Sequence, residues 1–146
     1  MFLVDSNVVV YRFDTAFPGK QAAAEALIRA GIASGELRLP YQALVESMAA
    51  LTRPRRDGSP AILPADAAAR ELEELSLSAT VLYPDERVFH TALRGALAYQ
   101  LPWFDALVWA VADRHGIPTL YTEDFGAGRI YGRTRVVNPF APSPTR

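Results

Sequence analysis

The chain contains no cysteine, which excludes a disulfide framework and every metal site built on thiolates. This absence fits the reducing cytoplasm, where we expect the protein to act. No apolar run approaches about 18 uncharged residues, so we expect no helix that spans a membrane. The apolar N-terminus is interrupted by Asp5 and has no basic residue before it, so we expect no signal peptide.

The chain also lacks an excess of charge of either sign, since its formal net charge is −1. A dedicated nucleic-acid binder with a broad basic surface is therefore disfavoured. A nuclease is not excluded, because it can hold its substrate through metal ions and a local arginine patch. Half of the 146 residues are hydrophobic and 21% are charged, which is typical of one globular domain.

Short apolar segments alternate with helical patterns along the chain. The pattern predicts strands at 2–4, 37–39, 80–82, 118–121 and 135–137, and helices over 19–34, 41–52, 65–77, 86–100 and 104–115, with Pro64 as the first helical residue before Ala65. This alternation favours an α/β fold: a mostly parallel sheet of four to five strands with helices on both faces. We assign residues 1–140 to one domain and residues 141–146 to a flexible C-terminal tail.

Two acidic residues follow predicted strands at the point where each strand ends. Asp5 comes directly after the first strand, and Asp124 follows the fourth after Thr122 and Glu123. The C-terminal ends of parallel strands share one edge of the sheet, where ligands bind. We therefore expect the Asp5 and Asp124 carboxylates to meet at that edge.

Two further acids lie in helical segments that are almost entirely small or apolar. Glu46 lies within residues 43–51 and Asp105 within residues 103–112. Such helices have no clear polar face, so we expect them to be buried. A buried carboxylate is costly unless a cation or hydrogen-bond donors compensate its charge. A cation shared with Asp5 and Asp124 provides that compensation.

The ligand type indicates which cation this would be. Carboxylates without His or Cys select hard ions such as Mg²⁺ and Mn²⁺. Such ions activate a water molecule and stabilise the leaving oxygen of a phosphodiester. The polar side chains of Ser6, Asn7 and Thr122 are placed to support the carboxylates or a phosphate.

Each acid also has a purely structural interpretation. Asp5 could be the N-cap of a helix that begins near Val8, and Asp105 could cap the helix that follows it. Glu46 could lie at the edge of a solvated helix, and Asp124 could lie in a turn before a glycine. A single acid favours these interpretations, whereas four acids at the positions where the topology converges favour a site.

The motifs that carry these acids resemble the PIN domain family in order and spacing. They are the opening Val4-Asp5-Ser6-Asn7-Val8, the helical Glu46, Phe104-Asp105-Ala106-Leu107, Tyr121-Thr122-Glu123-Asp124-Phe125, Gly128-Arg129 and the closing Val137-Asn138-Pro139-Phe140. The resemblance covers nearly the whole chain. Its length is similar to that of the VapC-type toxins of bacterial toxin–antitoxin pairs.

The resemblance implies a Mg²⁺- or Mn²⁺-dependent endoribonuclease that acts as the toxin of a type II toxin–antitoxin system. It further implies a homodimer and a cognate antitoxin whose C-terminal segment lies along the active-site groove. By position, Asp5, Glu46, Asp105 and Asp124 are the catalytic and metal-binding set, supported by Ser6, Asn7 and Thr122. Glu123 leaves open which of two adjacent acids points inward, and we favour Asp124.

A basic cluster next to an Asp-Gly-Ser-Pro loop is a candidate for gripping RNA phosphates. It consists of Arg53, Arg55 and Arg56, and its alternative interpretation is a solvated surface.

Two other functions compete with the nuclease. A haloacid-dehalogenase-like phosphatase would use Asp5 as its nucleophile, but that chemistry needs an acid two residues later, where this chain has Asn7. A non-catalytic binding module with the PIN fold would sequester a partner without cutting it. RNA cleavage that EDTA abolishes would distinguish the nuclease from this module.

Overall fold

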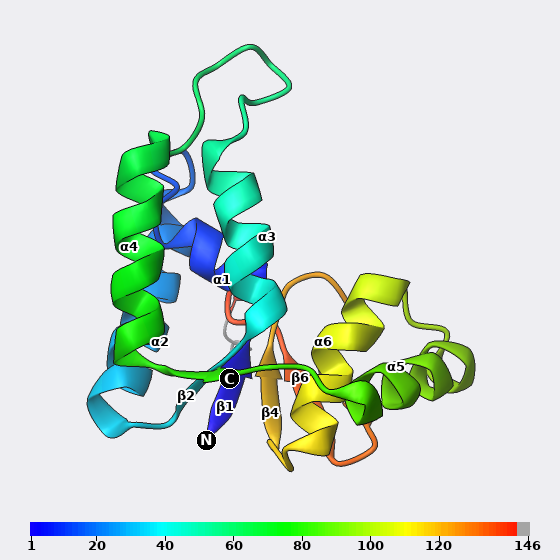
Figure 1. Ribbon diagram of the computed structural model, residues 1–146. Helices are drawn as coiled ribbons and strands as arrows, with labels where there is room; N and C mark the ends of the chain where they lie inside the picture. The colour runs from blue at the N-terminus through cyan, green and yellow to red at the C-terminus, as the bar shows by residue number, and fades with distance from the viewer. Residues whose placement is uncertain (143–146) are drawn as a thin grey trace.

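The computed structural model describes residues 1–142, which form a six-stranded sheet with helices on both faces (Figure 1). The strand order is β3-β2-β1-β4-β6-β5. All neighbouring strands pair in parallel except β5, which is antiparallel to β6. The strands are β1 (Phe2–Val4), β2 (Leu37–Pro40), β3 (Thr80–Leu82), β4 (Thr119–Tyr121), β5 (Ile130–Tyr131) and β6 (Thr134–Val137).

The helices are α1 (Ser6–Tyr11), α2 (Pro18–Ser34), α3 (Tyr41–Thr52), α4 (Ala65–Ser78), α5 (Glu86–Tyr99) and α6 (Trp103–Arg114). Helices α2 to α6 begin and end close to the residues that the sequence predicts, whereas the short α1 was not among the predicted helices. Gly35 ends α2 in the left-handed conformation, with φ of 70°, which a residue without a Cβ adopts at little cost. Asp85 caps α5 by accepting a hydrogen bond from the Val88 N–H at 2.9 Å.

The alternation of side chains along β1 divides the core into two parts. Leu3 packs with α5 and α6 on one face of the sheet, and Val4 packs with α1 to α4 on the other. Figure 1 shows the two groups of helices on opposite sides of the strands. Since β1 is central, with Leu3 and Val4 fully buried on opposite faces, the residue that follows it emerges at the middle of the sheet edge.

Three details differ from the prediction. The sheet has six strands because the two-residue strand β5 forms a tight hairpin with β6, too short to give a pattern of its own. Pro64 is the N-cap of α4 and not its first helical residue. Helix α3 is not buried all round, because the apolar side chains of Tyr41 and Val45 are 45% and 51% exposed.

Among residues 1–142, no helix is both long and apolar enough to cross a membrane. The predicted tail at 141–146 falls largely on residues 143–146, which lie outside the described part of the chain. The proposed boundary after residue 140 remains a prediction.

Candidate metal centre

Asp5 lies at the C-terminal end of β1, and its side chain is almost completely buried, with 2% exposed. Its backbone N–H donates to the Tyr121 carbonyl at 3.0 Å, which continues the β1–β4 ladder by one residue. Its carboxylate accepts hydrogen bonds from the Ser6 N–H at 2.7 Å and the Thr122 hydroxyl at 2.9 Å. Asp5 is therefore the N-cap of α1 and also part of the sheet-edge cluster.

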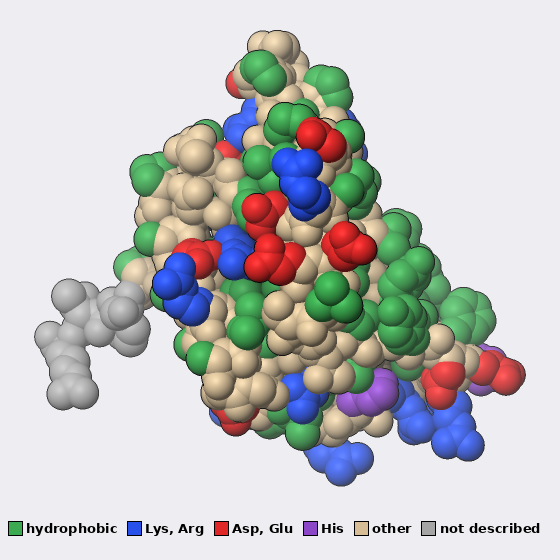
Figure 2. Space-filling model, turned by 60° about the vertical axis from the view of Figure 1, so that its left-hand side comes forward, with side chains coloured by type: hydrophobic (Ala, Val, Ile, Leu, Met, Phe, Trp, Pro, Cys, Tyr) green, Lys and Arg blue, Asp and Glu red, His purple; other side chains and the backbone are tan. Residues whose placement is uncertain are grey.

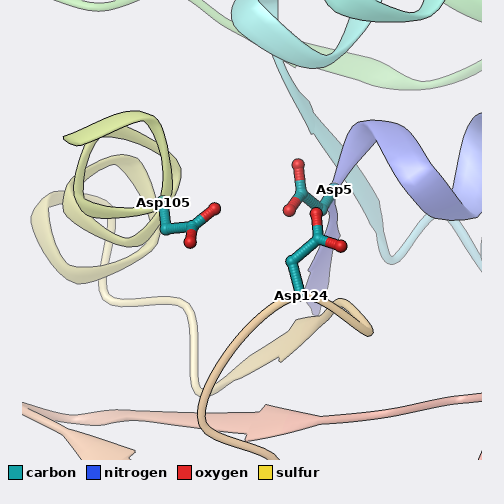
Figure 3. A group of neighbouring side chains, drawn as sticks. All are labelled: Asp5, Asp105 and Asp124. Atoms are coloured by element: carbon teal, nitrogen blue, oxygen red, sulfur yellow. The ribbon is translucent and has the colours of Figure 1, made fainter. Parts of the chain in front are cut away.

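Asp105 and Asp124 bring their carboxylates to the same place (Figure 3). One oxygen from each of Asp5, Asp105 and Asp124 lies within 4.8 Å of the others. Asp105 lies in the first turn of α6, whose N-cap is Pro102, and its side chain makes no capping hydrogen bond. The interpretation of Asp105 as a helix cap is therefore wrong.

Burial, and to a lesser degree the closeness of the other acids, raises the pKa of two carboxyl groups in this cluster. Burial raises the pKa of Asp5 to about 7, and the nearby Asp124 and Glu46 carboxylates add to the rise. Burial also raises the pKa of Asp105 to about 6, again with contributions from Asp124 and Glu46. A cation bound between them would favour the ionised carboxylates and reverse this effect.

Glu46 lies at the border of the cluster and is not within the 4.8 Å group. Its carboxylate accepts hydrogen bonds from the Ser6 hydroxyl at 2.9 Å and from the Gln42 amide at 2.6 Å. The Ser6 N–H binds Asp5, so Ser6 links the two acids. Gln42 was missed by sequence reasoning, although it lies one helical turn before Glu46 on the same face of α3.

Asn7 and Thr122 connect the remaining acids. The Asn7 amide N–H₂ donates to the Thr122 hydroxyl at 2.9 Å and to Asp124 Oδ2 at 3.0 Å. The Thr122 hydroxyl accepts from the Asp124 N–H at 3.2 Å while donating to Asp5. The three predicted supporting residues thus all contact acids of the cluster.

Of the two adjacent acids after β4, Asp124 points into the cluster and Glu123 points away from it. Glu123 Oε2 lies 2.7 Å from the Nζ atom of Lys20 in α2. Nothing in the sequence marks Lys20 as a neighbour of this site, because 103 residues separate it from Glu123.

The three predicted arginines lie at the end of α3 and in the loop that follows it. Together with Asp14 they line a hollow of about 620 Å³. Arg55 forms an ion pair with the buried Asp14, at 2.5 Å, whereas Arg53 and Arg56 are exposed. Figure 2 shows Arg and Lys side chains beside the acidic side chains on one face of the molecule. The structure therefore divides the cluster into one arginine that anchors the loop and two that face solvent.

The donor set suits a hard divalent cation. Carboxylate oxygens from three separate elements converge, with no nitrogen or sulfur ligand among them. Mg²⁺ and Mn²⁺ bind such sites through a few carboxylates and keep water or substrate oxygens in their other positions. The raised pKa values of Asp5 and Asp105, caused first by burial and then by the neighbouring carboxylates, are typical of functional sites.

The sequence model of the family described as PIN domain matches residues 2–132 of the 146-residue chain. No curated protein matches the chain in sequence.

Several solved structures share the fold. FitAcB from Neisseria gonorrhoeae is 18% identical with a TM-score of 0.68, and the match covers 96% of this chain and 99% of that one. A toxin–antitoxin complex from Klebsiella pneumoniae is 20% identical with a TM-score of 0.66, covering 95% and 98%. VapC20 of Mycobacterium tuberculosis, described as a sarcin–ricin loop cleaving toxin, is 19% identical with a TM-score of 0.60, covering 82% and 87%. At these identities the similarity establishes the fold.

Proposed function

This chain belongs to the PIN domain family, and we propose that it is a Mg²⁺- or Mn²⁺-dependent endoribonuclease that acts as the toxin of a type II toxin–antitoxin pair. The observation that carries the proposal is the convergence of Asp5, Asp105 and Asp124 from three elements at the carboxyl edge of the sheet. The solved structures of similar fold include a toxin–antitoxin complex and a sarcin–ricin loop cleaving toxin, which supports the same function.

Each polar residue has a role in this proposal. Asp5, Asp105 and Asp124 would hold the ion, and Glu46 faces the same space from α3 through its link to Ser6. A bound Mg²⁺ or Mn²⁺ would activate water and stabilise the negative charge that develops on the phosphodiester. Asn7 and Thr122 fix the directions of the Asp5 and Asp124 carboxylates, so that the site is ordered before substrate arrives.

The exposed Arg53 and Arg56 would bind RNA phosphates further along the backbone from the acids. They lie at the end of the helix that carries Glu46, so the scissile phosphate and the neighbouring backbone can contact one element. Arg55 would hold the loop in place through Asp14, not contact RNA. Phosphate contacts of this kind give affinity without reading sequence.

An apolar hollow beside the acids supports a protein partner. It measures about 310 Å³ and is lined by Glu46 together with Tyr41, Val45 and Phe104, whose side chains are well exposed. An antitoxin segment that filled this hollow would cover the approach to Glu46 and block RNA.

Helix α5 exposes three apolar side chains that are spaced one helical turn apart, Phe89, Leu93 and Leu97. This exposed apolar stripe would form the contact surface of a homodimer.

Incubation of the purified protein with total RNA tests the proposal. We expect cleavage with Mn²⁺ or Mg²⁺, none with EDTA, and at least about a 100-fold loss of rate in Asp124→Asn, as for removal of a group that stabilises the reacting charge. Sequencing of the cut ends would identify the RNA and the bond. Cleavage that persists in EDTA, or in Asp124→Asn, would contradict the proposal.

The non-catalytic module predicts no cleavage with any metal, although it would still bind a partner. Expression in cells separates the two functions as well. We expect growth to slow without the antitoxin, and Asp5→Asn to abolish this effect while the protein remains folded.

The phosphatase alternative gains no support from the site, because the Asn7 amide donates to Asp124 and Thr122 and supplies no second acid there.

A further inference from the structure

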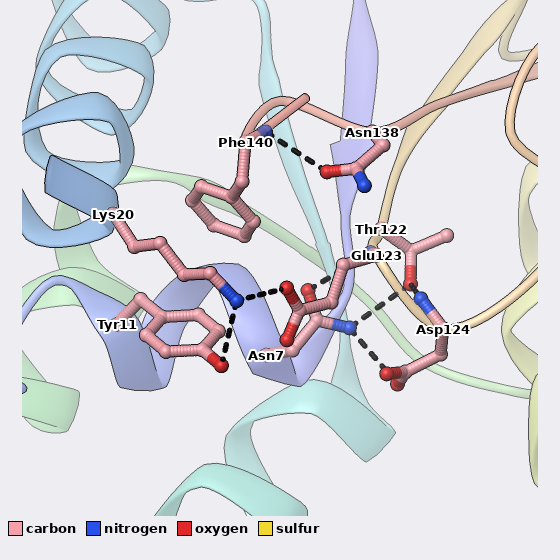
Figure 4. A network of polar contacts seen from close by, with 8 residues as sticks. All are labelled: Asn7, Tyr11, Lys20, Thr122, Glu123, Asp124, Asn138 and Phe140. Carbon is pink, nitrogen blue, oxygen red and sulfur yellow. Dashed lines mark hydrogen bonds and ion pairs between the residues drawn. The ribbon is translucent and has the colours of Figure 1, made fainter. Parts of the chain in front are cut away.

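Lys20, the single lysine of the chain, forms an ion pair beside the acidic cluster (Figure 4). Its Nζ atom lies 2.7 Å from Glu123 Oε2 and donates to the Tyr11 hydroxyl at 3.2 Å. The Lys20 ammonium group is charged at neutral pH, as lysine ordinarily is, and its hydrogen bonds to Glu123 and Tyr11 raise its pKa further. The Lys20 ammonium group therefore pairs with Glu123, the acid that directly precedes Asp124.

Three aromatic rings from separate parts of the chain surround this ammonium group. Its Nζ atom lies 4.5 Å from the centre of the Tyr11 ring, 5.7 Å from that of Phe17 and 5.6 Å from that of Phe140. Such rings attract a cation through their faces. Phe140 belongs to the segment after β6, where its N–H donates to Asn138 Oδ1 at 2.9 Å. The Lys20 side chain is thus held in one place by elements far apart in sequence.

Glu123 connects Lys20 to the site. Its backbone N–H donates to Asn7 Oδ1 at 3.3 Å, which orients the Asn7 amide so that the N–H₂ group faces Asp124 and Thr122. The Glu123 carboxylate points the other way, toward Lys20 (Figure 4). Glu123 therefore helps to order the acidic cluster through its backbone N–H, while its carboxylate lies outside the cluster.

An unrestrained carboxylate at position 123 would compete with its neighbours. It is adjacent in sequence to Asp124, and a divalent ion binds any carboxylate oxygen that reaches it. An additional oxygen ligand would occupy a coordination position needed for water or phosphate. A partly exposed ion pair contributes little to stability, so an ion pair enclosed by three aromatic rings beside a site needs a different explanation.

We propose that Lys20 is a positioning residue of this site, which holds the Glu123 carboxylate outside the acidic cluster and thereby keeps the coordination positions of the ion open for water and RNA. This inference rests on the proposed function. Lys20 itself touches neither the ion nor the RNA.

Replacement of Lys20 by Met, which keeps the length and removes the charge, tests the proposal in the full-length protein. We expect kcat for RNA cleavage at saturating Mn²⁺ to fall about tenfold, as for other groups that orient metal ligands, with KM little changed. In the absence of RNA, Mn²⁺ binding measured by calorimetry should become tighter, because a positive charge is lost and a carboxylate is released.

The double variant Lys20→Met, Glu123→Gln decides the cause. If Lys20 acts by restraining the Glu123 charge, removal of that charge makes Lys20 dispensable. The double variant should then regain most of the lost kcat and the Mn²⁺ affinity of the parent. A lysine that instead binds RNA phosphate predicts a raised KM, a weaker salt dependence and no recovery in the double variant, which would overturn the proposal.

Arg12→Met is the matched control for loss of an ion pair. Arg12 Nε lies 2.6 Å from Glu25 Oε2, and its guanidinium lies 5.6 Å from the Phe13 ring centre, but the pair does not contact Glu123. We expect Arg12→Met to leave kcat and Mn²⁺ binding unchanged.

A general structural role for Lys20 predicts that Lys20→Met weakens Mn²⁺ binding, that the double variant does not recover, and that Arg12→Met has a similar effect. Each of these results would overturn the proposal. If the parent binds Mn²⁺ and cleaves RNA and Lys20→Met does both equally well, the role of Lys20 is refuted while the proposed function stands. A parent that neither binds Mn²⁺ nor cleaves RNA would refute the proposed function, and this inference with it.

Discussion

At the scale of single residues, the site depends on uncharged side chains as much as on acids. Thr122 is completely buried, and its hydroxyl makes three hydrogen bonds: it donates to Asp5 Oδ2 and accepts from Asn7 and from the Asp124 N–H. The hydroxyl thus binds the Asp5 carboxylate directly, and it orients the Asn7 amide, which in turn binds the Asp124 carboxylate. Its position directly after β4, beside Asp5 after β1, follows from the parallel pairing of those strands.

We expect Thr122→Val, which keeps the shape and removes the hydroxyl, to lower RNA cleavage by about tenfold or more. It should also lower the free energy of unfolding by about 1–2 kcal/mol, because the Asp5 carboxylate loses a buried donor. Cleavage assays and urea denaturation measure the two effects. Thr122→Ser keeps the hydroxyl and is the control. Equal losses of activity in both variants would show that packing, not the hydroxyl, is what the site needs.

Residue by residue, sequence reasoning identified the acids because two of them follow strands and two interrupt apolar helices. Those signals come from topology and from the cost of burying charge. Lys20 and Gln42 gave no such signal, because each is an ordinary polar residue on a helix. Their contacts with Glu123 and Glu46 depend on how the helices pack, which local pattern does not specify.

At the scale of elements, α3 and the loop after it join the site to the arginine cluster. Figure 1 shows this loop projecting between α3 and α4. Arg55 anchors it through Asp14, whose side chain is 7% exposed. Arg53 and Arg56 face solvent from the same segment.

We expect replacement of both Arg53 and Arg56 by Ala to weaken RNA cleavage uniformly across sequences. The slope of log affinity against log salt concentration should decrease by about one to two, since each phosphate contact contributes about one. Binding measured at several salt concentrations tests this. An unchanged salt slope in this double variant would show that Arg53 and Arg56 are solvated surface residues that do not contact RNA phosphates.

Arg55→Ala should instead lower the free energy of unfolding by roughly 2 kcal/mol, because it leaves the buried Asp14 unpaired.

Helices and strands were predicted about equally well, since one of each, α1 and β5, was not assigned from the pattern. Proline and glycine mark the ends of α2, α3 and α4 in the sequence, and Asp85 marks the start of α5. Strand β5 could not be found in this way, because two residues are too few to show an alternating pattern. The exposed apolar face of α3 was also missed, since hydrophobic composition predicts burial and cannot indicate a face left for a partner.

At the scale of the whole molecule, the acidic cluster couples stability to pH. The pKa of Asp5 is about 7 and that of Asp105 about 6 in the folded state, against 3.8 for both ordinarily. The folded protein therefore holds these protons more tightly than the unfolded chain. The contribution of these groups to the free energy of unfolding must fall as pH rises from about 4 to about 7, and is constant above that.

We therefore expect the metal-free protein to melt at a higher temperature near pH 5.5 than near pH 8, and this difference to shrink when Mn²⁺ is added. Melting curves across this range in EDTA and in Mn²⁺ measure the effect. Asp105→Asn, compared with the parent at each pH, separates the contribution of the cluster from that of other titrating groups. A metal-free midpoint that rises between pH 5.5 and pH 8 by the same amount in both proteins would contradict this account.

The most direct test of the central claim, that these carboxylates form one divalent-cation site, is the melting midpoint of the parent and of Asp105→Asn at pH 7.5, in EDTA and in Mn²⁺. We expect Mn²⁺ to raise the parent midpoint by mass action. In EDTA, Asp105→Asn should melt about 3 °C above the parent, because relief of roughly 1 kcal/mol of repulsion and burial cost shifts the midpoint by about that much. Mn²⁺ should then raise its midpoint little. An Asp105→Asn protein that melts below the parent in EDTA and responds to Mn²⁺ as the parent does would contradict the shared site.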